Sequence, residues 1–235
     1  RSRGLGDVYK RQIQKAADII NGNTIQPGEE WSFNTVVGPR TYELGWKGAN
    51  GISGGKEYTI QAGGGICQVS TTLYNALLCA NMEIVDRRAH TIPSDYVPVG
   101  LDATVDTRGI DFVWKNNTDM PAYIFAKVEK VEGSSSRHTI TVYVYGKPLP
   151  EGVTYQSRNE IIEERSRQDE AIYTNDASIP TGYQLERVQG HKYYVAEAYQ
   201  DKYVDGKLAE SKLLYTDKYK GCLLYTSPSP RDRSL

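Results

Sequence analysis

The feature that most constrains this chain is a run of three glycines, Gly63 to Gly65, directly before a strongly patterned segment. Glycine adopts positive φ angles easily, so the run predicts a sharp turn. After the turn, apolar residues recur every three or four positions, as they do along one buried face of a helix: Ile66, Val69, Leu73, Leu77 and Ala80. We therefore expect a tight turn that opens a helix over residues 67–80.

Most of the remaining chain has the pattern of strands. Residues 138–145 alternate apolar and polar side chains, and Asp205-Gly206 suits the turn of a hairpin over residues 193–215. Short strands are expected at 83–87 and 96–99, longer strands at 110–115 and 122–131, and another helix at 13–20. The sequence predicts an α+β fold: an N-terminal domain with a helix opened by a Gly-rich turn packed on an antiparallel sheet, followed by a small all-β module.

Both ends of the chain can be encoded by the same DNA string, read on opposite strands. The string GGGCTCGGAGATGTGTATAAGAGACAG encodes Gly4 to Gln12, and its reverse complement, read one base in, encodes Cys222 to Pro230. The string resembles a transposase-type sequencing adapter, so we expect residues 1–12 and 222–235 to be artefact tails. The expected domains are then 13–150 and 151–221, divided where Pro and Gly cluster near residues 148–152. A chain clipped at both ends leaves room for a signal peptide or membrane anchor outside the fragment.

Composition excludes several classes of protein. The formal net charge of the 235 residues is −1, which argues against nucleic-acid binding through a global basic field. The chain contains no apolar run near the ~20 residues of a membrane-spanning helix. Its 3 Cys are too few for a disulfide-stapled miniprotein.

Cys67 is the leading candidate for a catalytic residue. It follows the glycines and opens the expected helix, where free N–H groups and the positive end of the helix dipole favour a thiolate. The N–H groups of Cys67 and Gln68 can also bind the oxyanion of an acyl-transfer intermediate. The alternative is a buried structural cysteine, which is how we interpret Cys79, beside the apolar stripe of the same helix.

A thiolate nucleophile needs a base and an orienting acid. Among His90, His138 and His191 we select His90, because a return from helix to strand brings it back towards Cys67. Asp102 is the first choice for the acid, and Asp95 and Asp111 stay open. A surface or structural role is the alternative for each of these side chains.

Other chemistries have less support. The sequence contains no His-Glu-x-x-His, no Cys-x-x-Cys and no close His pair, so no metal site is expected. The glycine run lacks the Gly-Lys-Ser/Thr ending of a phosphate-binding loop, and no cofactor is expected.

A longer stretch resembles a known family. The segment Gly63-Gly64-Gly65-Ile66-Cys67-Gln68-Val69-Ser70-Thr71-Thr72-Leu73-Tyr74-Asn75-Ala76 is similar to the VanW family. The similarity continues upstream in Val37-Gly38-Pro39-Arg40-Thr41 and downstream in Tyr96-Val97-Pro98-Val99-Gly100-Leu101-Asp102-Ala103-Thr104-Val105, and covers roughly residues 13–145. The resemblance implies an extracytoplasmic, cell-envelope protein of mainly Gram-positive bacteria, associated with glycopeptide resistance.

Some members of the family are reported to act as L,D-transpeptidases that cross-link peptidoglycan stem peptides through a cysteine. Carried onto this chain, the nucleophile is Cys67, and stem peptides are the expected partners, with no nucleic acid. The order of Cys, His and Asp also suggests papain- and transglutaminase-like enzymes, by analogy of fold only. A second hypothesis is a non-catalytic domain that binds the cell wall, with Cys67 packed in the glycine turn.

The remaining site residues are assigned by their place in these motifs. Gly64, Gly65 and Gln68 are expected to form the turn and the oxyanion site. Arg40, Ser70 and Thr71 are expected to bind substrate, with Arg40 paired to a substrate carboxylate. A structural Arg40 that bonds loop carbonyls is the alternative.

Overall fold

The computed structural model describes residues 3–53, 57–133, 138–166, 171–175 and 185–227. In chain order its elements are α1 (Arg3–Ile20), β1 (Thr24–Ile25), β2 (Glu30–Ser32), α2 (Phe33–Val37), β3 (Gly48–Ser53), β4 (Glu57–Ala62), α3 (Ile66–Cys79), β5 (Glu83–Asp86), β6 (Val113–Lys115), β7 (Ala122–Lys130), β8 (His138–Tyr145), β9 (Val153–Arg165), β10 (Ala171–Asn175), β11 (Leu185–His191), β12 (Tyr193–Val204), β13 (Lys207–Tyr219) and β14 (Cys222–Ser227).

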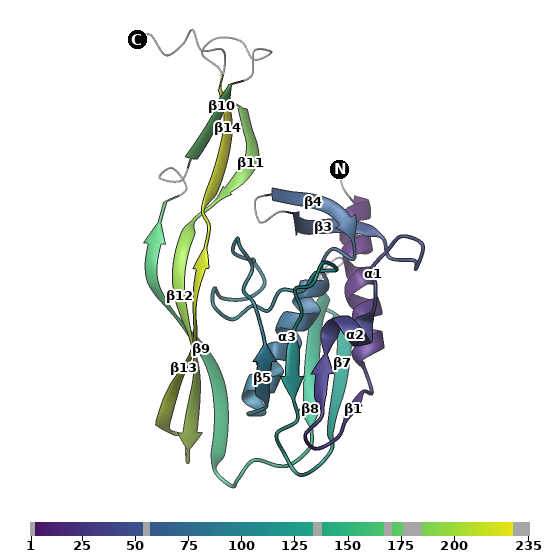
Figure 1. Ribbon diagram of the computed structural model, residues 1–235, viewed down its shortest axis with the longest axis vertical. Helices are drawn as coiled ribbons and strands as arrows, with labels where there is room; N and C mark the ends of the chain where they lie inside the picture. The colour runs from purple at the N-terminus through teal and green to yellow at the C-terminus, as the bar shows by residue number, and fades with distance from the viewer. Residues whose placement is uncertain (1–2, 54–56, 134–137, 167–170, 176–184, 228–235) are drawn as a thin grey trace.

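The first domain is built on a three-stranded antiparallel sheet in the order β1-β7-β8. Helix α1 packs against β7 and helix α3 against β8, as Figure 1 shows. Alternate residues of β7 point into this core, so Ile124 is buried while Phe125 is exposed. Leu73 and Leu77 supply the buried face of α3. A second small sheet, β2-β6-β5, lies beside them, and β3 and β4 form a hairpin that leads into the glycine turn.

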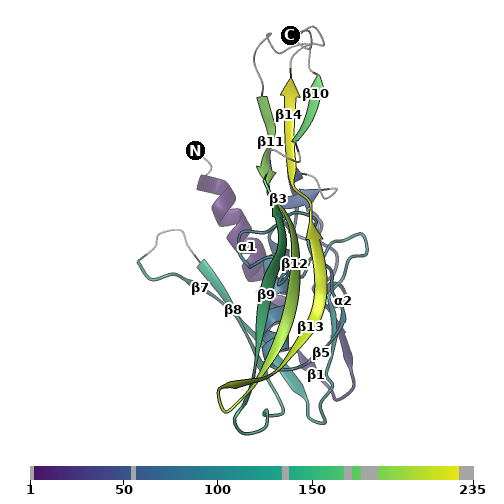
Figure 2. The same ribbon diagram turned by 90° about the vertical axis from the view of Figure 1, so that its left-hand side faces the viewer.

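A long antiparallel sheet in the order β13-β12-β9 forms the second module, called here the β-module (residues 153–165 and 193–219). Its β12–β13 turn has Asp205 at φ 50° and Gly206 at φ 75°, the two positive φ angles of a type I′ turn. The sheet packs on α3 through β9, so α3 lies between the two modules (Figures 1 and 2). A further sheet contains β10, β14 and β11, with β10 parallel to β14.

The α+β class predicted from sequence is confirmed, as are α3, β8 and the hairpin at Asp205-Gly206. Three local expectations were wrong. Residues 96–99 form no strand, α1 begins at Arg3 instead of residue 13, and Cys79 is exposed. Position 79 follows the buried Leu77 by two residues, which turns its side chain about 200° around the helix from that stripe. The boundary at residue 150 stays a prediction, and β9 begins just after it.

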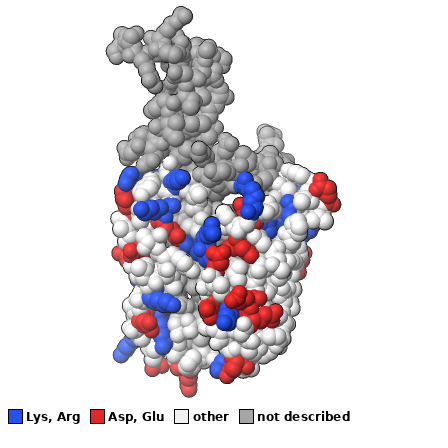
Figure 3. All heavy atoms as spheres, in the orientation of Figure 1, with Lys and Arg blue, Asp and Glu red and all other residues white. Residues whose placement is uncertain are grey.

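Within the described residues, no helix has the length and apolar character needed to cross a membrane. Acidic and basic side chains are interspersed over the face drawn in Figure 3.

Candidate active site

The glycine turn places Cys67 in the first turn of α3. Gly63 and Gly65 have φ angles of 75° and 94°, which side-chain-bearing residues rarely adopt. A Cβ atom on Gly63 would also lie 2.7 Å from Ile66 Cδ1, so the end of that side chain would have to move. The Cys67 sulfur is 3.3 Å from the Val105 carbonyl oxygen and 3.6 Å from the Thr104 hydroxyl oxygen.

His90 and Asp102 complete a row of three interacting side chains. The segments that carry them run side by side, because the Thr104 N–H donates to the Arg88 carbonyl at 2.8 Å. Asp102 Oδ2 accepts from the His90 backbone N–H at 2.6 Å and pairs closely with His90 Nδ1. Since Nδ1 faces Asp102, Nε2 is the ring nitrogen left to interact with the Cys67 thiol, and the pKa of each of these two groups depends on the other. The structure brings together the three residues that sequence reasoning selected.

Electrostatics in this row favour an ion pair. Burial alone would raise the pKa of the Cys67 thiol, but the hydrogen bond and the positive charge of His90 lower it below its ordinary value. Burial alone would lower the pKa of His90, but its bonds to Asp102 and Cys67 raise it to about 10. The pKa of the Asp102 carboxyl is lowered by His90 and Arg87 against the effect of its burial. All three shifts favour the charged forms, a thiolate, an imidazolium and a carboxylate.

The other oxygen of Asp102 is bonded from two directions. Tyr219, at the end of β13, donates its hydroxyl to Asp102 Oδ1 at 2.5 Å, and Arg87 NH2 lies 3.2 Å from the same oxygen. Arg87 also donates to the Asp102 carbonyl at 2.6 Å and to the Gly100 carbonyl at 3.0 Å. Asp217 of β13 accepts from Arg87 NH1 at 2.5 Å. Two residues of the β-module thus reach the environment of Asp102.

The expected oxyanion site is only partly available. The Gln68 N–H donates to the Gly65 carbonyl at 3.1 Å, which leaves it unsuited to an oxyanion. No described backbone carbonyl outside α3 accepts from the Cys67 N–H, so this donor is available. Gly64 is buried inside the turn. The Tyr9 ring covers Gly65, and its hydroxyl donates to the Gln68 side chain at 3.2 Å.

Ser70 and Thr71 have a different role from the one expected. Both are buried, with exposed fractions of 0% and 2%. The Ser70 hydroxyl donates to the Ala103 carbonyl at 2.7 Å, and Thr71 Oγ1 accepts from the Ala103 N–H at 3.0 Å. They face the interior because their positions lie next to the apolar stripe of α3. Their hydroxyls fasten the segment that carries Asp102 to the helix, and do not face a substrate.

Arg40 is buried beside the glycine turn. Its NH1 donates to Asn34 Oδ1 at 2.7 Å, and Asn34 in turn donates to the Asp106 carbonyl at 3.0 Å, next to Val105. Its NH2 is buried and has no hydrogen-bond partner among the described residues. Burial lowers the pKa of Arg40, and the nearby charge of Cys67 opposes that effect. A buried cation near the thiol with an unused donor fits an anion better than a purely structural arginine.

The alternative base and acid residues lie elsewhere. His138 begins β8 and His191 ends β11. Asp111 accepts from the Ser32 hydroxyl at 2.5 Å and the Asn34 N–H at 2.9 Å, at the start of α2. Asp111 thus serves to cap that short helix.

Sequence reasoning missed Arg87, Tyr96, Asp217 and Tyr219. The Tyr96 ring meets the His90 ring edge-on, with centroids 6.4 Å apart. Tyr215, Asp217 and Tyr219 alternate along the sequence, which was the one local signal that one face of the end of β13 packs against the rest of the protein. Which residue that face contacts could not be read from it, because Asp102 lies more than a hundred positions away along the chain.

Comparison with known proteins gives the family. A family model described as "VanW like protein" matches residues 9–140. The chain belongs to the VanW family. It is 46% identical over 115 residues to "Uncharacterized protein YoaR" of Bacillus subtilis (strain 168), a match that covers 49% of this chain and 38% of YoaR.

A second VanW relative matches over more of the chain. This is "Vancomycin B-type resistance protein VanW" of Enterococcus faecalis (strain ATCC 700802 / V583), 28% identical over 230 residues, which cover 93% of this chain and 73% of that protein. Among solved structures, "IgA1 Protease G5 domain structure" matches with TM-score 0.22 and 10% identity, covering 33% of this chain and 92% of that one. "Crystal structure of HP0197-G5" matches with TM-score 0.20 and 23% identity, covering 32% and 92%.

Proposed function

We propose that this VanW-family chain is a cysteine-dependent acyltransferase of the cell envelope, an L,D-transpeptidase that acts outside the cytoplasm on peptidoglycan stem peptides. The observation that carries the proposal is the row Cys67–His90–Asp102, which combines a thiol of lowered pKa with an imidazole of raised pKa at a helix start. Membership of the VanW family, and a relative named for vancomycin resistance, support a place in cell-wall chemistry.

The first half-reaction cleaves the donor peptide. The Cys67 thiolate attacks the carbonyl carbon of the third residue of a tetrapeptide stem, and the carbonyl electron pair moves onto oxygen. The Cys67 N–H donates to this oxyanion. When the oxygen re-forms its double bond, the C–N bond breaks and the leaving amine of the terminal D-residue takes a proton from the His90 imidazolium. The products are a thioester on Cys67 and a free D-amino acid.

The second half-reaction forms the cross-link. The amine of a neighbouring stem attacks the thioester carbon, and His90 takes the proton that this amine loses. The C–S bond then breaks and returns Cys67 to its thiolate. Water in place of the amine would release the peptide as a free acid, which is peptidase activity. Asp102 keeps its charge throughout and orients the imidazole.

Arg40 is the proposed partner of the donor's terminal carboxylate. That carboxylate lies one residue beyond the bond that breaks, and the unused NH2 of Arg40 belongs to a cation within electrostatic reach of the Cys67 sulfur. A guanidinium bonds carboxylates in a planar, two-pronged geometry. We expect Arg40→Gln to raise KM for the tetrapeptide.

The deciding experiment incubates the protein with disaccharide-tetrapeptide and identifies the products by mass spectrometry. We expect cross-linked dimer and free D-amino acid, and a loss of at least about 10³-fold in Cys67→Ala. Cys79→Ala is the matched control, because Cys79 is also a free cysteine and lies at the far end of α3.

Thiol reactivity separates this function from wall binding alone. Iodoacetamide at pH 6 should label Cys67 well before Cys79, whose thiol has a raised pKa because neighbouring protein partly desolvates it even though the residue is exposed. If neither dimer nor hydrolysed peptide forms, Cys67 reacts no faster than Cys79 and wall binding survives in Cys67→Ala, the non-catalytic alternative is correct.

A further inference from the structure

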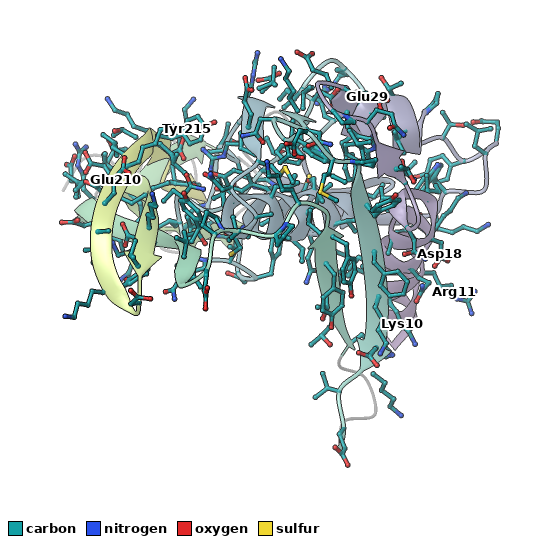
Figure 4. All side chains as sticks on the ribbon, turned by 90° about the horizontal axis from the view of Figure 1, so that it is seen from below. Lys10, Arg11, Asp18, Glu29, Glu210 and Tyr215 are labelled. Atoms are coloured by element: carbon teal, nitrogen blue, oxygen red, sulfur yellow. The ribbon has the colours of Figure 1, made fainter. Side chains whose placement is uncertain are left out.

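The end of β13 presents a row of alternate side chains to the first domain. Tyr219 is buried and Tyr215 and Asp217 are half-buried, while Thr216 and Lys218 between them are exposed. The Tyr215 ring lies 4.9 Å from the Arg87 guanidinium carbon, and Asp217 pairs with the same guanidinium. Figure 4 shows Tyr215 where the sheet meets the rest of the molecule, whereas Glu210 of the same strand lies on the outer side.

Tyr219 is the member of this row that touches the candidate triad. Its side chain has an exposed fraction of 0%. Its hydroxyl donates to Asp102 Oδ1 at 2.5 Å and accepts from the Gly100 N–H at 2.6 Å. Just after it, the Lys220 N–H donates to the Thr91 carbonyl at 2.7 Å, next to His90. Burial raises the pKa of Tyr219, so its hydroxyl stays protonated and remains a donor over the working pH range.

These bonds complete the surroundings of the Asp102 carboxylate. Oδ2 is taken by the backbone and the ring of His90, and Oδ1 by Tyr219 and Arg87. A carboxylate offers about four lone-pair directions, so four donors leave it no other orientation. The position of Oδ2 sets the orientation of the imidazole ring, and this ring gives and takes the proton in the proposed reaction at the Cys67 sulfur. Fixing Oδ1 therefore helps to align the nucleophile.

We propose that Tyr219 is a positioning residue for the Cys67–His90–Asp102 row, and that the β-module is for this reason part of the catalytic centre and not an appendage to it. The proposal rests on the proposed function for its kinetic consequence. Tyr219 lies outside residues 9–140, the part that the family model matches, so the centre described by that model is incomplete without β13.

The test replaces one hydroxyl. Tyr219→Phe keeps the ring and its packing and removes the donor. We expect kcat to fall roughly tenfold, the effect of losing one hydrogen bond to a charged group, while KM for the tetrapeptide changes by less than about twofold. Iodoacetamide labelling of Cys67 near pH 7 should slow by a similar factor. The Asp102 carboxyl, followed by ¹³C NMR and assigned with Asp102→Asn, should titrate at higher pH.

Tyr199→Phe is the matched control, because Tyr199 lies in β12 of the same sheet and its hydroxyl donates to Glu197. We expect wild-type values from it. A further measurement needs no variant at position 219: the Tyr219 hydroxyl proton should appear far downfield in the wild-type NMR spectrum and move upfield in Asp102→Asn. This keeps the proposal testable if Tyr219→Phe folds poorly.

The outcomes separate the two proposals. The positioning role is wrong if Tyr219→Phe lowers thermal stability but leaves the Asp102 titration and the rate of Cys67 labelling unchanged. It is also wrong if the chemical shift of the Tyr219 hydroxyl proton is the same in Asp102→Asn as in the wild type. Labelling and NMR need no substrate, so they test the role of Tyr219 even if the wild-type protein forms no cross-link. A wild-type protein with a reactive Cys67 and no acyl transfer would overturn the proposed function alone.

Discussion

At the scale of single residues, the protonation of Cys67 is coupled to that of His90. Each has its pKa moved towards the charged form, although His90 is buried and Cys67 is half-buried. Burial disfavours charge, so each charge depends on its partner. The pair should therefore respond together when one member is removed.

The first prediction concerns the titration of His90. In the wild type its imidazole should titrate near pH 10, and in Cys67→Ala at a lower pH, because the thiolate that holds the proton is gone. NMR of the ring resonances measures both values. An unchanged pKa in Cys67→Ala would show that Asp102 alone holds the proton.

The same pair predicts how stability depends on pH. The raised pKa of His90 contributes stability that is lost as pH rises from its ordinary pKa of 6.5 to about 10, whereas the lowered pKa of Cys67 contributes stability that is gained as pH rises towards its ordinary pKa of 9.0. Below pH 9 these two contributions to the free energy of unfolding oppose each other. Above pH 9 the unfolded pair has lost its last proton while His90 keeps one until about pH 10, so stability falls by up to about 1.4 kcal/mol per pH unit. Urea denaturation, compared with the same series in His90→Gln, isolates this contribution.

At the scale of elements, α3 does more than present the thiol. Ser70 and Thr71 bond both sides of the Ala103 peptide, so the helix also holds the segment that carries Asp102. One element thereby sets the distance between the first and last members of the row. This role depends on hydroxyls in a helix interior, where serine and threonine are otherwise poor choices.

Ser70→Ala should therefore cost stability and reactivity together. The Ala103 carbonyl loses its shorter hydrogen bond, and the free energy of unfolding should fall by about 1–3 kcal/mol. Cys67 labelling should slow as Asp102 loses support. Thr72→Ala is the control, since the Thr72 hydroxyl donates to Gln68 within the same helix. Equal slowing of labelling in both variants would contradict the assigned role of Ser70.

Sequence patterns predicted those elements whose cause is local. The apolar period of α3, the alternation of β8 and the positive φ angles of Asp205-Gly206 depend on near neighbours, and all three were found. The turn and helix also placed Cys67. Residues 96–99 contain the strand-forming residues Tyr and Val yet form no strand, because Pro98 has no N–H for a sheet hydrogen bond and pairing needs a partner that the local sequence does not reveal. The contacts of Arg87 and Tyr219 depend on how two modules pack, which no short pattern encodes.

At the scale of the whole molecule, Arg87 joins the two modules. Its side chain has an exposed fraction of 0%, and it lies between Asp102 of the first domain and Asp217 of the β-module. A buried cation with one partner removed is strongly unfavourable, even where the intact pair contributes little. The packing of the modules and the charge of the centre are therefore energetically connected.

A double-mutant cycle measures this connection. Arg87→Gln and Asp217→Asn should each destabilise the chain, and the double variant should be less destabilised than the sum, with a coupling of about 1–3 kcal/mol. Urea denaturation at pH 7 gives the four free energies of unfolding. Additive effects within about 0.5 kcal/mol would mean that the two residues act independently.

The position of Tyr219 near the end of β13 also has a consequence for biosynthesis. A ribosome makes the chain from its N-terminus, so Cys67, His90 and Asp102 are all translated long before the hydroxyl that orients the carboxylate. A nascent or prematurely terminated polypeptide carries the thiol without its full support. We therefore expect the hydrogen bonds around the Asp102 carboxylate to be completed only after β13 has been synthesised.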